Sequence, residues 1–283
     1  MSSPTNPRTP QSYHVGEIAP AGSGVGTALP PGLAIASLFS AVVAFALCAA
    51  LLVPLKGPVV ATMVAEVVFI AVPILWMWAG PRLSSGYSGV STIGIADALG
   101  LRRPAAVFVW AALLIGATQW ISNLALAYAL GPWLGATDSG VEQLSTIVDM
   151  PSMPLVVMAV AVMPAICEEI LFRGVLVRGL ATRFVPLVSV AISAIAFSAF
   201  HISLVRAVPT LMLGLVYGYI ALRARSVIPT ILAHFLNNFA ALAVGRGDLP
   251  FLSRMFDAHP TMLISVASGA TVAGIVLVAR SRR

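Results

Sequence analysis

The chain has 283 residues, of which 59% are hydrophobic and only 9% are charged, and its mean hydropathy is +0.98. Because a soluble domain carries about 25% charged residues, this composition excludes an ordinary soluble protein and predicts a polytopic protein of the lipid bilayer. The net charge of +6 does not indicate a nucleic-acid partner, since most arginines lie in short gaps between apolar runs, where they set membrane topology.

Residues 1–31 differ from the rest of the chain. Six prolines alternate there with Gly, Ser and Thr, and no apolar period is present. We therefore expect a disordered cytoplasmic N-terminal tail. The segment lacks the basic start of a signal peptide, and the apolar run that follows it is too long for one.

The remaining chain predicts an all-α, polytopic transmembrane helical bundle with about eight spans, since a spanning helix needs about 20 apolar residues. In chain order these spans are 33–54, 58–79, 105–130, 154–174, 185–205, 208–222, 227–245 and 261–279. The sixth span is short, and its start is marked by Pro209. Its residues Gly214 and Gly218 are four apart, which predicts close contact with a neighbouring helix.

The distribution of positive charge predicts the orientation. With the C-terminus in the cytoplasm, eight spans place the N-terminus there as well. Twelve of the sixteen Lys and Arg residues then fall on the inner side, Arg173 counted among them. Because inner loops carry the excess of positive charge, we expect a multi-pass protein of the cell membrane with both termini in the cytoplasm.

Three ionisable residues lie together at the end of the fourth span. Glu169 and Arg173 are four residues apart, so they share a helix face and can pair. Glu168 points about 100° away and has no such partner. Two adjacent carboxylates in a low dielectric do not both ionise easily, so the unpaired one is suited to act as a base. Taken alone, the cluster is also explained by an ion pair at a helix end.

Two lone histidines follow in later spans. His201 lies one turn after Phe197 in the fifth span, and His234 lies one turn before Asn238 in the seventh. Taken singly, His201 is also explained as an interfacial anchor, and the amides as contacts between helices.

Together these groups suit the activation of water. A carboxylate takes the proton, one histidine orients or shares it, and a second histidine with an amide stabilises an oxyanion. Two histidines and a carboxylate, here His201, His234 and Glu168, also form a ligand pattern of catalytic zinc. The sequence does not separate the two mechanisms, so zinc stays an open cofactor.

The three motifs in order, Glu168-Glu169-x-x-x-Arg173, Phe197-x-x-x-His201 and His234-x-x-x-Asn238, resemble the signature of the CPBP family. This family contains the type II CAAX prenyl endopeptidases and their bacterial relatives, including lysostaphin-resistance-like (Abi) proteins. The resemblance covers about residues 150–245.

This resemblance implies an intramembrane endopeptidase, a hydrolase that cleaves a membrane-associated or lipidated protein or peptide. It implies that Glu168 and His201 activate water and that His234 and Asn238 support the oxyanion. Glu169 and Arg173 are then structural or orienting. By the same resemblance we divide the chain into the tail 1–31, three spans in 32–131, a catalytic core 150–245, and an outer loop, last span and basic tail in 246–283.

Two other functions fit the composition. One is a non-catalytic immunity or scaffold protein of the membrane, and the other is a proton-coupled transporter, which internal repeats would favour and the sequence does not show. Glu66, in the second span, is an acid outside the three motifs. We expect it to form a hydrogen bond between packed helices rather than to line a water-filled cavity at the site.

One expectation conflicts with this grouping. At 1.5 Å per residue, Glu168 and His234 lie about 10 Å from the inner face, whereas His201 lies about 24 Å from it. Residues that act together must share a depth, so we expect the boundaries of the spans to differ from those given above.

Overall fold

The computed structural model describes residues 28–84, 87–89, 94–133 and 152–281, and these residues form helices and no strands. Seven helices are long and apolar enough to cross a membrane, and Pro186–Phe200 is a shorter apolar helix. The protein is therefore an all-α, multi-pass membrane bundle, as the sequence predicts. Residues 1–27 of the expected tail lie outside the described residues. Leu29, near the end of that expected tail, is buried.

The described elements follow the predicted spans in order. They are α1 (Pro31–Lys56), α2 (Pro58–Glu66), α3 (Val68–Leu83), α4 (Ile95–Ala98), α5 (Ala106–Leu130), η3 (Gly131–Trp133), α7 (Met153–Val157), η4 (Met158–Val162), α8 (Met163–Glu169), η5 (Ile170–Val177), α9 (Arg178–Leu180), α10 (Pro186–Phe200), α11 (Leu204–Ala224), α12 (Ile228–Gly245), α13 (Pro250–Ala258) and α14 (Pro260–Arg280).

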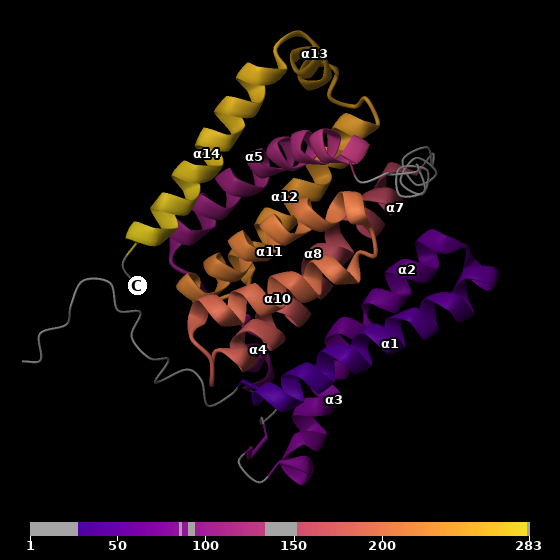
Figure 1. The fold of residues 1–283 in the computed structure, drawn as a ribbon. Helices are drawn as coiled ribbons and strands as arrows, with labels where there is room; N and C mark the ends of the chain where they lie inside the picture. The colour runs from indigo at the N-terminus through magenta and orange to yellow at the C-terminus, as the bar shows by residue number, and fades with distance from the viewer. Residues whose placement is uncertain (1–27, 85–86, 90–93, 134–151, 282–283) are drawn as a thin grey trace, which may run out of the picture.

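The bundle has two groups of helices around a central one (Figure 1). The helices α1, α2 and α3 pack on one another on one side, and α5 packs with α12 and α14 on the other. The pair α10 and α11 lies between them. Residues 153–180 run through the centre and contact both groups, so the polar residues of this span are enclosed by other helices.

The central span is one helix of 28 residues with two π-helical segments. The segments are η4 and η5, and the short helix α8, which carries both glutamates, lies between them. Single-turn π segments are rare and occur frequently at functional sites. The irregular backbone therefore marks the same place as the charged residues.

Glycines set the closest helix contacts. A Cβ atom on Gly214 would lie 2.8 Å from Ala194 Cα, and one on Gly218 would lie 2.9 Å from Val190. This confirms the close contact that their spacing predicts, and the partner is α10. A Cβ atom on Gly116 of α5 would collide with the backbone of Ala233, so α5 and α12 touch directly beside His234.

Candidate functional site

Glu169 is the centre of a buried ionic network. Its side chain is fully buried, and its Oε1 atom accepts hydrogen bonds from Arg173 Nη1 at 2.8 Å and from His234 Nδ1 at 2.9 Å. The pairing of Glu169 with Arg173 one turn later is the one that their spacing predicts. A charge inside a membrane bundle is costly unless it is paired, and Glu169 has two partners.

Arg173 is held between aromatic rings. Its guanidinium lies 4.2 Å from the centre of the Phe197 ring and 5.7 Å from that of Tyr217. The side chain is fully buried, so Arg173 belongs to the interior and not to the loop arginines that set topology. The aromatic faces and Glu169 together compensate its charge.

Glu168 lies beside His234 without a strong partner. Its Oε2 atom is 3.9 Å from His234 Nε2, and no hydrogen-bond donor is found for that oxygen among the described residues. The residue is 6% exposed. Because Glu169 receives the proton on His234 Nδ1, the other ring nitrogen, Nε2, faces Glu168. One carboxylate therefore orients the imidazole, and the other is left available for chemistry.

His201 ends α10 and is half-buried. Its Nδ1 atom lies 2.9 Å from the Phe197 carbonyl oxygen, which can only accept, so Nδ1 carries the proton. The neutral ring then has a free lone pair on Nε2. The Phe197 ring contacts both histidines, with ring centres 4.8 Å from His201 and 6.1 Å from His234.

Asn238 contacts the irregular backbone of the central span. Its Nδ2 atom donates to the Val160 carbonyl oxygen of η4 at 2.9 Å, and its Oδ1 atom accepts from Asn237 at 3.1 Å. One N–H of the Asn238 amide is used in this way, and the second is left for another acceptor. Asn237 is the more buried of the two amides.

The conflict in depth is largely removed by the observed helix ends. The central span continues to Leu180, which places Glu168 about 18 Å from its C-terminal end, and the start of α10 at Pro186 places His201 about 22 Å from the N-terminal end of that helix. The turn before α12 is buried, since Val227 is fully buried and donates to the Gly100 carbonyl. The start of α12 is thus enclosed by the bundle, and His234 lies within hydrogen-bond distance of Glu169.

A zinc site made of these groups is not formed in this structure. In the described parts of the chain, no three His, Cys, Asp or Glu side chains come together in a way that fits a metal ion. We derive no chemical step through a metal, and the zinc expectation from the sequence stays untested.

Several contributors were not expected from the sequence. Tyr217 lies in an ordinary-looking apolar span, and no spacing connects it with Arg173. Glu66 lies in a different part of the chain, where it is buried at the end of α2, and α2 packs on α8, the helix that carries Glu168. No hydrogen-bond partner is found for its Oε2 atom among the described residues, so the packing hydrogen bond expected from the sequence is not formed at that oxygen.

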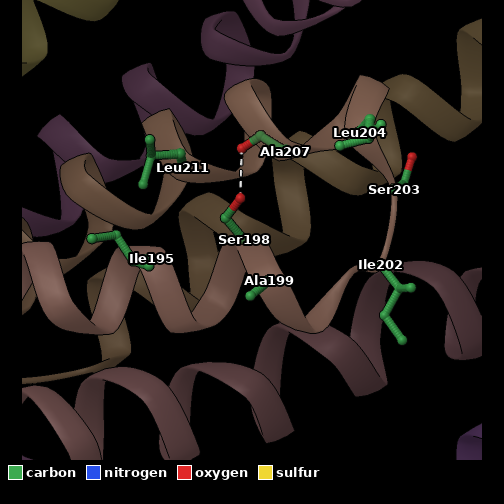
Figure 2. A pocket seen from close by; sticks show the side chains of 8 residues that line it. All are labelled: Ile195, Ser198, Ala199, Ile202, Ser203, Leu204, Ala207 and Leu211. Atoms are coloured by element: carbon green, nitrogen blue, oxygen red, sulfur yellow. Dashed lines mark hydrogen bonds between the residues drawn. The ribbon is translucent and has the colours of Figure 1, made fainter. Parts of the chain in front are cut away.

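A cavity of about 460 Å³ lies directly after His201, between α10 and α11 (Figure 2). Its lining is mainly apolar, and Ser198 donates from within it to the Ala207 carbonyl oxygen at 2.7 Å. The acids and histidines of the site do not line it. An apolar cavity beside the site is suited to an apolar group rather than to the chemistry itself.

Comparison with known proteins identifies the class of the central region. Residues 150–240 match the family model described as type II CAAX prenyl endopeptidase Rce1-like. No curated protein and no solved structure matches the chain. The match confirms the resemblance to the CPBP family, and it contains all seven motif residues. The match covers less than half of the chain, and it does not extend to the first three spans or the last one.

Proposed function

We propose that the protein is an intramembrane endopeptidase that hydrolyses a peptide bond of a membrane-associated or lipidated protein. The observation that carries this proposal is the state of Glu168. It is a buried carboxylate without a hydrogen-bond donor at Oε2, 3.9 Å from an imidazole that a second carboxylate orients. An unpaired base beside a fixed imidazole is the arrangement that general-base hydrolysis requires.

The proposed reaction begins with a water molecule between Glu168 and the histidines. Glu168 takes a proton from the water, and the hydroxide attacks the carbonyl carbon of the scissile bond. His201, whose free Nε2 atom faces away from its bond to Phe197, orients the water. Glu168 then gives the proton to the leaving amine, which closes the cycle.

His234 and Asn238 stabilise the tetrahedral intermediate. The Glu169 carboxylate holds His234 at Nδ1, which leaves Nε2 as the ring atom that meets the developing oxyanion. Asn238 offers its second N–H. Arg173 holds Glu169 at Oε1, the oxygen that also binds His234, so Glu169 and Arg173 orient the imidazole and do not touch the substrate.

The position of the reaction in the membrane follows from the same residues. The site lies inside the bundle, so the scissile bond must enter the bilayer, and the apolar cavity beside His201 suits a lipid chain or an apolar flank of the substrate. We place the protein in the cell membrane with both termini in the cytoplasm, on the distribution of Lys and Arg.

The experiment compares membrane proteomes of cells that carry the wild-type protein and the Glu168→Ala variant. New C-termini present with the wild type and absent with the variant identify the substrate. The same new C-termini in cells with a stable, inserted Glu168→Ala protein would show that the activity belongs elsewhere and that this chain acts as a non-catalytic partner. Metal analysis of the purified protein tests the zinc alternative.

A further inference from the structure

Another cavity, of about 380 Å³, lies between the starts of α5 and α12. One charged residue, Arg103, contributes to its lining, and the other lining residues are apolar: Pro104, Ala106, Val109, Trp110 and Ile228. The acids and histidines of the site do not line it. Two spans therefore form an apolar space with a cation at its edge, apart from the proposed chemistry.

The charge of Arg103 is not used by the protein itself. Arg103 is exposed, and within the part of the chain that the structure describes it forms no hydrogen bond and no ion pair. Its neighbour Arg102 pairs with Asp97 at 3.1 Å. The nearby Arg178 donates to the Ala98 carbonyl oxygen at 2.8 Å. Arg103 therefore keeps its guanidinium available for a partner outside the chain.

Further positive charge lies close to this cavity. Arg223 and Arg225 stand at the end of α11. Val227, which follows them, donates to the Gly100 carbonyl oxygen at 3.0 Å, and this bond brings the end of α11 to the loop that carries Arg103. A local excess of positive charge of this kind attracts an anionic partner.

The lining matches the two parts of a phospholipid. Arg103 lies before the start of α5, whereas Val109 and Trp110 lie on its first turns, about 6 Å further along the helix. Trp110 is 68% exposed, and tryptophan is enriched where a span meets the membrane surface. A headgroup phosphate fits the arginine, and an acyl chain fits the apolar wall below it. A free phosphate would use the arginine alone.

We propose that this cavity binds an anionic phospholipid, with its phosphate at Arg103 and an acyl chain against Trp110. In the proposed orientation this end of the bundle faces the cytoplasm, where the leaflet carries anionic headgroups and basic pockets between spans bind them. The bound lipid joins α5 to α12, the helix that carries His234 and Asn238. The binding itself does not depend on the proposed protease function.

The test uses the tryptophan fluorescence of the purified protein in phosphatidylcholine vesicles, because bromine on an acyl chain quenches a tryptophan that it touches. We expect brominated phosphatidylglycerol to quench more strongly than brominated phosphatidylcholine at equal content. Trp110→Phe should abolish this difference, since it removes the reporter. Arg103→Gln should weaken the preference for the anionic lipid about fivefold, the effect of one cation near an anionic headgroup.

The matched control is Arg280→Gln. Arg280 is an exposed arginine at the end of α14, which Arg223 joins to the end of α11 through the Ala279 carbonyl oxygen, and it does not line the cavity. We expect this variant to keep the preference of the wild type. An equal loss in Arg280→Gln and Arg103→Gln would overturn the proposal, because the attraction would then belong to the whole surface.

Two other occupants of the cavity give different results. Equal quenching of the wild type by both brominated lipids would show that the cavity accepts any acyl chain, and would refute an anionic site. Loss of the preference on addition of inorganic phosphate at constant ionic strength would show a site for free phosphate, and would refute a lipid site. Each result is read without a cleavage assay.

Discussion

At the scale of single residues, the hydrogen bonds of Glu169 explain why Glu168 and Glu169 have different roles. It accepts from Arg173 and from His234 at the same oxygen, and so it is held as a carboxylate between two cations or donors. Glu168, its neighbour in sequence, has no such short bond, and its Oε2 atom approaches His234 Nε2 only to 3.9 Å. The difference follows from the helix, because consecutive residues point about 100° apart.

The sequence predicts these different roles of the two glutamates, because the four-residue spacing of Glu169 and Arg173 is visible in it. It does not predict the bond between His234 and Glu169, because that contact depends on how far α12 extends into the bundle. The buried turn before α12 sets that position, and a turn of this kind leaves no periodic signal.

Removal of the arginine should destabilise the protein strongly. Arg173→Met leaves Glu169 as a buried charge with one partner fewer, and we expect the free energy of unfolding to fall by about 3–5 kcal/mol. Guanidinium unfolding in detergent micelles, followed by tryptophan fluorescence, measures this. The double variant Glu169→Gln/Arg173→Met should be more stable than the single one, because no uncompensated charge remains. A double variant that loses the sum of both single effects would contradict the pairing.

At the scale of elements, the two π segments shape the central span. Each has a carbonyl oxygen that accepts from a side chain of a neighbouring helix: Asn238 of α12 donates to Val160 in η4, and Ser193 of α10 donates to Phe172 in η5 at 3.0 Å. These bonds fix three helices around α8. π-Helical segments have no sequence signature comparable to the period of an α-helix. The sequence therefore predicts where the span lies but not where its π-helical segments lie.

The contact between α5 and α12 should tolerate no added atom at Gly116. We expect Gly116→Ala to push α12 away, with a loss of about 1–3 kcal/mol in unfolding free energy and a lower cleavage rate, since His234 directly follows Ala233. Unfolding and cleavage assays on the same preparation measure both effects.

The control for this prediction is Gly269→Ala in α14. A Cβ atom there meets no other atom within 4 Å, so the change should be neutral or slightly stabilising. If Gly116→Ala matched the control in both assays, the close approach of the two helices would be wrong.

At the scale of the whole molecule, the protein combines regular outer helices with broken inner ones. The outer helices α1 and α14 are mostly exposed to lipid, whereas more than half of the central span is buried. Apolar length alone identifies such spans, so the sequence predicts the membrane fold and all eight apolar segments. The ends of the fourth and fifth spans are predicted less well: the fourth continues to Leu180 and the fifth stops at Phe200, because buried polar residues and turns interrupt the apolar pattern on which their prediction rests.

The central claim is that Glu168 is the base of an intramembrane hydrolysis, and one measurement tests it most directly. Purified wild-type and Glu168→Gln proteins are reconstituted in lipid vesicles with the substrate found from its new C-terminus, and kcat is compared after equal thermal stability has been verified. The account predicts a fall in kcat of at least about 100-fold, since a positioned general base contributes about 10²–10⁴-fold. A Glu168→Gln protein that cleaves within about twofold of the wild type would contradict it.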